Sequence, residues 1–304
     1  MKKIAIRIFI FCIPILMVWG AVEYFYRAVP NNYSSKSHQI TEKSNEIEVL
    51  LFGSSHCLYG LNPVFFTQNT FNLSGISQTI YFDKLLLEHY MDSLPKLKKV
   101  VFCIEYTNLS QKDNTQDDVF RKYYYASFMD LKVPLIAQYD SKKYSLALTR
   151  SLRVSLDLMK DYYNKGTILN CDENGWGNDY KKTNRIITYQ EGKERAKAHE
   201  DGSMDFRVNK SRIYDLIREC ENRDIEVLIV SMPVSKAYSQ NLNPEKVQLI
   251  FKACREFETS NKNVRYLNLF NDNRFVDDDF YDADHLNEVG ATKCSKIVNA
   301  FISS

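Results

Sequence analysis

Five short apolar runs, each separated from the next by polar or amphipathic sequence, constrain the fold of this chain most strongly. The runs are nearly continuous in hydrophobicity and rich in β-branched residues, as is typical of strands that are covered on both faces of a parallel sheet. Their alternation with amphipathic helices predicts an α/β domain with a parallel sheet of about five strands. The predicted strands are Glu48–Phe52, Thr70–Leu73, Lys99–Ile104, Glu226–Ser231 and Val264–Leu269, and the predicted helices are Gln78–Leu94, Lys210–Asn222, Val247–Phe257 and Glu288–Ile302.

Residues 110–203 interrupt this alternation between the third and fourth predicted strands. The segment has no convincing core strand, but it contains a tyrosine-rich stretch around Tyr123–Tyr125 and a helical pattern over Tyr144–Tyr163. Because a loop of this length without secondary structure is uncommon, we expect a mostly helical insertion. It serves either as a plain structural subdomain or as a lid over the carboxyl edge of the sheet. Its tyrosines either stack on sugars or form the core of the insertion.

The N-terminus carries a long apolar stretch with no charge between Ile8 and Val22. Counted from Ile4, the stretch is long enough to cross a bilayer. Aromatic residues lie at its far end, where such rings favour the headgroup layer, and three basic residues precede it. This charge pattern predicts a cytoplasmic start, so that the rest of the chain lies in the periplasm or outside the cell.

A cleaved signal peptide is the alternative interpretation of this stretch. Its apolar region would be shorter, and no small-x-small cleavage pattern precedes Glu23. Residues 27–46 are polar, contain a proline and are typical of a stalk. We therefore expect a membrane anchor over residues 1–26, a stalk over 27–46 and a catalytic-type domain over 47–304 that carries the insertion 110–203.

Composition excludes several classes of protein. Lys plus Arg number 40 and Asp plus Glu number 38, and a net charge of +2 argues against a partner that is a nucleic acid. The seven cysteines are scattered without a CxxC pair, so neither a zinc knuckle nor a dense disulfide framework is indicated. Most of them lie in apolar patterns as small core residues. Cys57 could act as a nucleophile, but no base is assigned to it.

Small and polar residues follow most of the predicted strands. The carboxyl ends of parallel strands meet at one edge of a sheet, where α/β proteins place their ligands. We therefore expect a functional site built from the segments that come after the strands. These segments are Gly53–Cys57, Asn72–Ile76, Glu105–Asn108, Met232–Val234 and Phe280–Asn287.

A serine, a histidine and an aspartate within these segments can fill the three roles of acyl transfer. Ser55 supplies a hydroxyl, His285 a base, and Asp282, three residues earlier, a carboxylate that orients the base. The backbone N–H groups of Ser55 and Gly75 and the side chain of Asn108 are the candidate donors to an oxyanion. Ser55 alone would be an ordinary turn residue, and the hypothesis depends on the three roles being filled together.

Two further readings concern the neighbours of these residues. Asp282, Asp284 and His285 offer ligands of the kind that zinc or iron takes, but no second histidine motif is present, so we expect no metal and no other cofactor. His56 follows Ser55 directly, and its side chain would leave in the opposite direction if the strand continued. We therefore assign His56 to packing or to support of the site.

These motifs resemble those of the SGNH (GDSL-like) hydrolases. The chain has Gly-Ser-Ser-His after the first predicted strand, Asn-x-x-Gly after the second, and Asp-x-x-His-Leu-Asn-x-x-Gly over Asp282–Gly290, which is the most specific block. The resemblance covers Glu48–Ser304 apart from the insertion, and it places Ser55, Gly75, Asp282 and His285 on family positions. It implies a three-layer α/β/α fold of the flavodoxin-like kind and esterase chemistry.

The chain departs from the family pattern at two points. Gly-Ser-Ser replaces Gly-Asp-Ser, a common variant in the membrane-tethered branch, and Glu105–Asn108 stands where the family has Gly-x-Asn-Asp. With its N-terminal anchor, the chain is most similar to that branch, which includes the D-alanyl transfer protein of teichoic-acid modification and acetyltransferases of exported polysaccharides.

The resemblance implies a serine esterase or O-acyltransferase that acts on acylated cell-envelope polysaccharide through an acyl-enzyme. Its substrate would be an acylated glycan or another acyl donor, and a membrane-bound acyltransferase is a candidate partner. Hydrolysis and transfer both stay open. The alternative is a non-catalytic or weakly active, membrane-anchored assembly factor in envelope polymer modification or export, which the missing third block favours.

Overall fold

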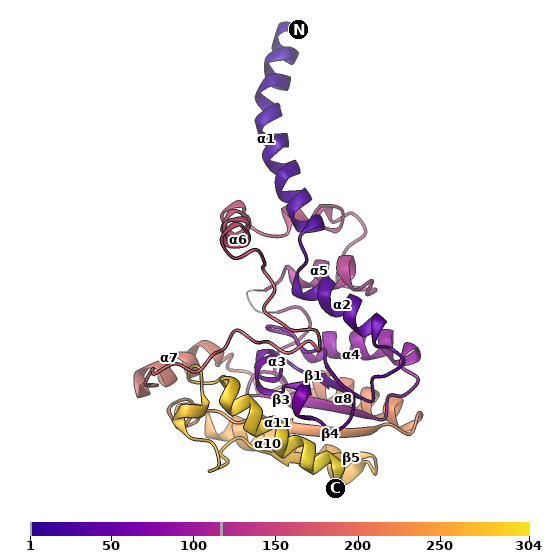
Figure 1. Ribbon diagram of the computed structural model, residues 1–304, viewed down its shortest axis with the longest axis vertical. Helices are drawn as coiled ribbons and strands as arrows, with labels where there is room; N and C mark the ends of the chain where they lie inside the picture. Colours follow the sequence, from indigo (N-terminus) through magenta and orange to yellow (C-terminus); the bar gives the residue numbers. More distant parts are fainter. Residues whose placement is uncertain (1, 116–117) are drawn as a thin grey trace. The chain divides into compact units, whose positions relative to one another are not determined.

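The computed structural model describes residues 2–115 and 118–304 (Figure 1). These residues form two compact units. The helical unit comprises residues 2–37 and 118–169, and the sheet unit comprises residues 38–115 and 170–304. The insertion 110–203 contributes residues to both units, and the division at residues 26 and 46 stays a prediction.

The sheet unit is built on one parallel sheet of five strands in the order β2-β1-β3-β4-β5. All five predicted strands are confirmed to within one residue at each end. Residues of β1, β3 and β4 are almost all buried, which explains why these runs are apolar without alternation. The strands are β1 (Val49–Phe52), β2 (Thr70–Asn72), β3 (Lys99–Ile104), β4 (Glu226–Ser231) and β5 (Val264–Asn268).

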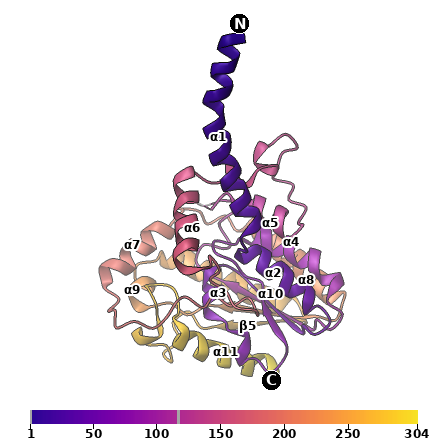
Figure 2. The same cartoon turned by 45° about the horizontal axis from the view of Figure 1, so that its top comes forward.

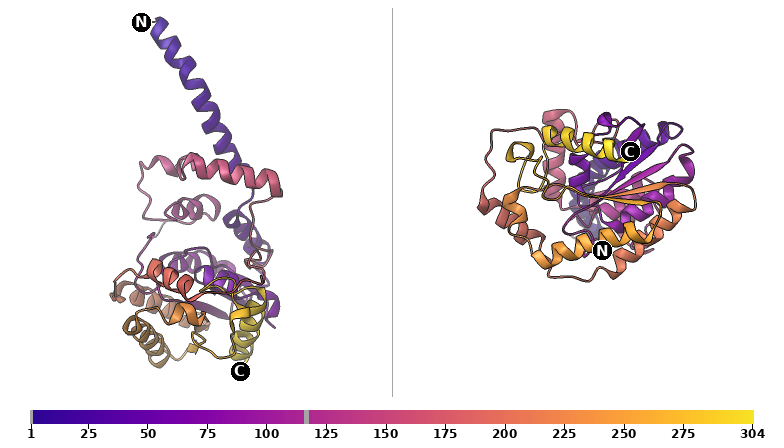
Figure 3. Two further views of the ribbon diagram at one scale, coloured as in Figure 1. Left: turned by 90° about the vertical axis from the view of Figure 1, so that its left-hand side faces the viewer. Right: turned by 90° about the horizontal axis from the view of Figure 1, so that it is seen from below.

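Helices cover both faces of this sheet, as the view in Figure 3 (right) shows. On one face, α11 (Glu288–Ser303) places Val298 and Ile302 against alternate residues of the central strands, among them Val49 and Val101. On the other face, Phe52 stacks on Phe102 with ring centroids 5.4 Å apart. The remaining long helices of the sheet unit are α4 (Ile80–Tyr90), α8 (Arg207–Glu221) and α10 (Pro244–Ser260). The three-layer α/β/α architecture is therefore confirmed.

Five cysteines of the sheet unit lie in its core. Cys57, Cys103, Cys220, Cys254 and Cys294 are all buried, as expected of small core residues. The shorter helices of the sheet unit are α3 (Ser55–Gly60), η1 (Pro63–Phe65), η2 (Met91–Ser93), α7 (Tyr189–His199), α9 (Lys236–Ser239) and η5 (Asp277–Asp279).

The helical unit joins the N-terminal helix to part of the insertion. Its core contains Val22, Phe25 and Tyr26 together with Tyr124 and Leu146. Tyr123–Tyr125 are buried, so these rings form a subdomain core, which was one of the two expectations for them. The elements are α1 (Lys2–Ala28), α5 (Arg121–Phe128), η3 (Ser141–Lys143), η4 (Leu146–Leu148) and α6 (Leu152–Lys165), and α2 (Asn32–Glu42) follows α1.

One expectation about local structure needs correction, and one expected segment gains detail. The helix predicted over Tyr144–Tyr163 begins only at Leu152, because Ser151 is its N-cap and accepts a hydrogen bond from the backbone of Val154. Within the expected stalk, residues 27–46, the chain forms the helix α2. Asn31 starts this helix by accepting hydrogen bonds from the backbone N–H groups of residues 33 and 34.

Candidate active site

The turn from β1 into α3 presents Ser55 at the carboxyl edge of the sheet. Gly53 adopts a φ of 139°, and a Cβ there would come within 3.0 Å of the side chain of Cys103, so the turn requires glycine. Ser54 is the N-cap of α3, and Ser55 is its first residue. The Oγ of Ser55 lies 2.8 Å from Nε2 of His285, a residue 230 positions away in the sequence.

A tight loop before α11 fixes the orientation of His285. Nδ1 of His285 lies 3.0 and 3.1 Å from the two carboxylate oxygens of Asp282. One of these oxygens also accepts the backbone N–H groups of Asp284 and His285, at 3.1 and 2.8 Å. Because the carboxylate is held by its own backbone, the imidazole has its Nδ1 directed to Asp282 and its Nε2 directed to Ser55.

The remaining residues of the Asp-x-x-His-Leu-Asn-x-x-Gly block hold this loop on α11. Asn287 is the N-cap of α11 and also donates to the carbonyl oxygens of Asp278 and Phe280, at 2.8 and 3.2 Å. A Cβ at Gly290 would lie 2.2 Å from the carbonyl oxygen of Asp279, so only glycine permits this approach. Asn287 and Gly290 therefore stand at these positions because both hold the loop before His285 against the start of α11.

The second motif supports the site in a different way from the one expected. Asn72 donates to the carbonyl oxygens of Cys57 and Leu61, at 3.1 and 2.9 Å, and so ties β2 to α3. The N–H of Gly75, expected to face an oxyanion, instead donates to the carbonyl oxygen of Gly53 at 3.1 Å. In this conformation Gly75 therefore closes the turn after β1.

The other two expected oxyanion donors lie in different surroundings. Asn108 is buried, and its side chain accepts the backbone N–H of Glu105 at 2.6 Å, so it stabilises its own turn after β3. Ser55 is the first residue of α3, and the N–H groups of a first helical turn have no acceptor within the helix. The N–H of Ser55 is the candidate donor that the local geometry favours most.

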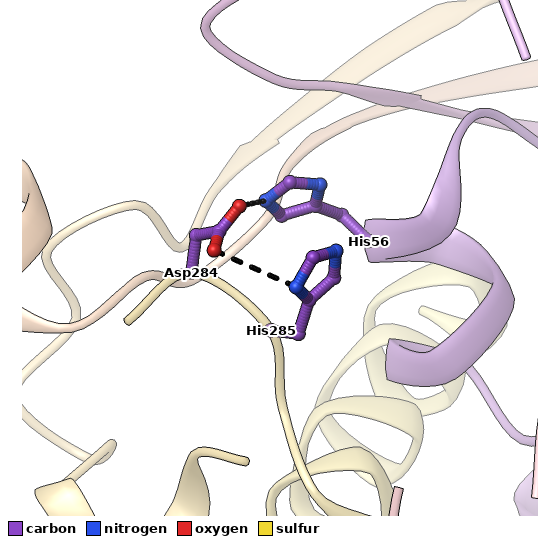
Figure 4. Close-up of side chains that lie close together, drawn as sticks. All are labelled: His56, Asp284 and His285. Carbon is purple, nitrogen blue, oxygen red and sulfur yellow. Dashed lines mark ion pairs between the residues drawn. The ribbon is translucent and has the colours of Figure 1, made fainter. Parts of the chain in front are cut away.

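A buried network of charges lies behind His285, and sequence reasoning did not find it (Figure 4). His56 pairs with Glu105 through Nδ1, and its Nε2 lies 3.3 Å from Asp284. Asp284 is fully buried, and its other oxygen lies 3.5 Å from Nδ1 of His285. The rings of His56 and His285 are 4.6 Å apart. The side chain of His56 was expected to point away from that of Ser55 if the strand continued. The strand ends before them and the helix α3 starts at Ser55, so His56 points toward Asp284 instead.

The ionisation of this network follows from its partners. Burial disfavours the charged form of His56, but Glu105 and Asp284 outweigh burial and raise the pKa of His56 to about 10. Burial likewise disfavours the charged form of Glu105, yet His56 lowers the pKa of Glu105 to about 2. The pKa of Asp284 is held well below its ordinary value against burial by His285, His56 and Arg195. The positive charge of His56 and the negative charges of Glu105 and Asp284 therefore stabilise one another.

The helix α7 adds two side chains to this network from the insertion. Nε of Arg195 donates to Asp284 at 2.7 Å, and Nδ1 of His199 lies 2.7 Å from the hydroxyl of Tyr238. Burial lowers the pKa of His199, which favours its neutral form. Gly192 allows α7 to approach this closely, because a Cβ there would lie 2.1 Å from the carbonyl oxygen of Ala237. No local pattern in the sequence pairs Arg195 with Asp284.

Three stacked tyrosines flank His285. The ring of Tyr59 stacks on Tyr180 with centroids 3.6 Å apart, and Tyr180 stacks on Tyr281 at 4.0 Å. The ring of Tyr180 meets His285 edge to face at 5.5 Å. This stack shields one side of the imidazole from water, and Tyr180, its middle ring, belongs to the insertion.

A metal centre fits this arrangement poorly. His56, Asp284 and His285 have potential ligand atoms within 4.8 Å of one another. However, Nε2 of His285 faces Ser55, its Nδ1 faces Asp282, and both nitrogens of His56 face carboxylates. A metal ion at this position would have to displace these partners, so the cluster is better described as a network of ion pairs.

We predict that Glu105→Gln destabilises the protein in a way that depends on pH. The pKa of His56 lies above its unfolded value, so its stabilising effect is complete below about pH 6.5 and is lost as the pH rises through about 10. The thermal unfolding midpoint of the variant should therefore lie below that of the wild type near pH 6, and the difference should narrow toward pH 10. The exposed substitution Glu88→Gln is the control. A difference in unfolding midpoint that stays constant between pH 6 and pH 10 would contradict the ion pair between His56 and Glu105.

We also predict that Gly192→Ala displaces α7 from the site. The added methyl group meets backbone atoms, which cannot move aside easily, so the variant should lose about 1–3 kcal/mol of stability, as overpacked positions do. The measurement is denaturant unfolding, with the exposed neighbour Lys193→Ala as control. Equal midpoints for the two variants would show that α7 tolerates the methyl group.

Comparisons with known proteins add little to this site. No family model matches the chain, and no curated protein matches it. Among solved structures, one described as "a putative platelet activating factor from Streptococcus pneumonia" is similar at 13% sequence identity. Its TM-score is 0.42, and the match covers 96% of this chain and 98% of that chain.

Proposed function

We propose that the protein is a membrane-anchored serine esterase or O-acyltransferase that acts on acylated cell-envelope polysaccharide. The observation that carries this proposal is the hydrogen-bonded line from Ser55 through His285 to Asp282. Nucleophile, base and orienting carboxylate are within hydrogen-bond reach of one another, which is the arrangement that activates a serine. The resemblance of the motifs to SGNH hydrolases supports the same chemistry.

The reaction has two halves that use the same base. His285 accepts the proton of Ser55 at Nε2 while Oγ attacks the acyl carbonyl, and the N–H of Ser55 stabilises the oxyanion. His285 then returns the proton to the departing alcohol, which leaves the acyl group on Ser55. In the second half, His285 takes a proton from water or from a sugar hydroxyl, and this oxygen attacks the acyl carbonyl. The bond between this carbonyl and Oγ of Ser55 then breaks, and His285 returns the proton to Oγ. Asp282 stabilises the imidazolium in both halves.

The buried network supports the role of Asp282 as the partner of His285. Asp284 also faces Nδ1 of His285, but His56 and Arg195 already neutralise Asp284. Among the described residues, Asp282 forms an ion pair with no Lys or Arg, and both of its carboxylate oxygens lie within 3.1 Å of Nδ1 of His285. Asp284 is therefore a positioning residue, and Asp282 is the carboxylate that orients His285.

Ester turnover tests the proposal directly. We expect that Ser55→Ala and His285→Ala each lower turnover of nitrophenyl acetate by about 10³-fold or more, because removal of a triad member disables the whole unit. Ser55→Ala should also abolish labelling by a fluorophosphonate. Ser54→Ala, which removes the adjacent hydroxyl, is the matched control and should keep the label. A label that survives Ser55→Ala would reject this nucleophile.

A second candidate function rests on the oxyanion donors. The N–H of Gly75 donates to Gly53, and the side-chain amide N–H of Asn108 donates to Oε1 of Glu105 at 3.4 Å. Because these donors have partners of their own, the site offers fewer free donors than an efficient esterase requires. This feature favours a weakly active or non-catalytic assembly factor for envelope polymers. A folded wild-type protein that gives neither turnover nor a fluorophosphonate adduct would support that alternative.

The helical unit supports an anchor that is retained in the mature protein. The last turns of α1 contribute Val22, Phe25 and Tyr26 to the core of this unit. Glu23 accepts hydrogen bonds from Ser145 and from the backbone of Ala147, at 2.8 and 2.9 Å. Cleavage within or after these turns would remove residues of this core, whereas a signal peptide has no lasting contacts with the protein it exports.

We therefore predict that the membrane fraction holds the uncleaved chain. Intact mass spectrometry of the protein extracted from membranes should include residues 1–26, and an alkaline wash should not release it. The apolar exposed residues of α1 before Trp19 account for this behaviour. A soluble protein with its first residue at or after Glu23 would contradict the anchor.

A further inference from the structure

Exposed large hydrophobic side chains are concentrated in the helical unit, on α1 up to Trp19 and again between residues 139 and 163. Among the described residues of the sheet unit, such side chains are scattered, which is ordinary for a soluble surface. In the helical unit they follow one another closely along the chain between residues 139 and 163. We call this group the apolar belt, and it consists of Tyr139, Tyr144, Leu148, Leu152, Val154, Leu156, Tyr162 and Tyr163.

The helix α6 presents three members of the belt as a stripe. Leu152, Leu156 and Tyr163 have the spacing i, i+4 and i+11, so they lie on one face of the helix. Their exposed fractions are 52%, 49% and 88%. A helix that docks on a protein with one face normally turns its polar residues outward, so a second apolar face needs a second apolar environment.

The inner face of α6 is occupied by the C-terminal part of α1. The hydroxyl of Ser155 lies 2.9 Å from that of Tyr26, and the ring of Tyr162 meets Phe25 at 5.9 Å. In Figure 2, α6 lies beside the C-terminal part of α1, and Figure 3 (left) shows that α6 crosses the end of α1. The stripe of α6 is therefore separate from the face that packs within the helical unit.

An apolar groove of about 430 Å³ connects α6 to the exposed part of α1. Ile15 and Val18 of α1 line one side, and Ala147 and Leu152 line the other. The exposed apolar residues of α1 continue from this groove toward the N-terminus. Whatever surrounds the apolar part of α1 therefore also reaches Leu152 and the stripe.

The polar groups around the belt match the headgroup layer of a bilayer. Arg153 and Lys160 lie on the face of α6 next to the stripe, and long basic side chains can extend from there to phosphates. Lys142 and Lys143 immediately precede Tyr144 in the belt. Trp19, beside the groove, is 43% exposed, and tryptophan and tyrosine are enriched at this depth.

We propose that the helical unit is embedded in the headgroup layer of the bilayer that α1 crosses, with α6 parallel to the membrane plane. The stripe faces the acyl chains, and lipid chains fill the groove between α6 and α1. This arrangement is that of an interfacial amphipathic helix beside a membrane span. The inference rests on the membrane anchor of the proposed function, and it adds a second site of contact with lipid.

Tryptophans placed by substitution can measure the depth of each helix. The full chain is reconstituted in vesicles of phosphatidylcholine and phosphatidylglycerol whose acyl chains are brominated either near the glycerol or near mid-chain. Leu156→Trp reports on the stripe, and Asp161→Trp, on the opposite face of α6, is the matched control. Phe11→Trp reports on α1. The fluorescence of each added tryptophan is obtained by subtracting the fluorescence of the unmodified protein from that of the variant.

We expect Leu156→Trp to lose most of its added fluorescence with bromine near the glycerol, whereas Asp161→Trp should keep it. Phe11→Trp should be quenched best by mid-chain bromine. If Phe11→Trp is quenched and Leu156→Trp behaves like Asp161→Trp, the inference is overturned and the anchor stands. A protein helix seated on the stripe instead of lipid would give this result. Equal quenching at both α6 positions would also overturn it. An unquenched Phe11→Trp would overturn the anchor as well.

Discussion

The hydrogen bond between Ser55 and His285 is the contact on which the site depends, and the topology of the sheet explains how it forms. Ser55 follows β1, which lies inside the sheet between β2 and β3, while His285 comes after the edge strand β5. The chain must therefore return from the edge to the middle along the carboxyl ends of the strands. Ser235, after β4, holds this return path, because its hydroxyl donates to the carbonyl oxygen of Ala283 at 2.6 Å. The hydrogen bond thus requires both the parallel sheet and the loop that crosses its edge.

The buried charges around Asp284 limit which substitutions the site tolerates. Asp284 is fully buried between two histidines and Arg195, and removal of one partner from such a network leaves a buried charge without compensation. Arg195 comes from the insertion, while His56 is adjacent to the candidate nucleophile. Through Arg195, the insertion is therefore part of the electrostatic support of the site. A loss of α7 would change the charge that His285 experiences even though Ser55, Asp282 and His285 remained in place.

The sequence predicted those features that depend on local patterns. The strands were predicted within one residue, since strands buried on both faces must be apolar throughout. Ser55, Asp282 and His285 were found because three roles appeared together after strands. The contacts of Arg195 and His56 with Asp284 join distant segments and leave no periodic signal. The start of α6 was missed because one N-cap, Ser151, outweighs the helical pattern before it. The partner of the Gly75 N–H depends on the turn at Gly53, which the sequence does not specify alone.

The core of the helical unit joins two segments that are far apart in the sequence. Tyr124 and Leu146 belong to the insertion, yet their core partners Val22 and Phe25 belong to α1. The chain passes between the two units three times, near residues 37, 117 and 169, so the helical unit is assembled from separate stretches of the chain. Without α1, the insertion would expose these apolar side chains to water, at a cost of roughly 25 cal/mol for each Å². The last turns of α1 and the insertion therefore stabilise each other within the helical unit.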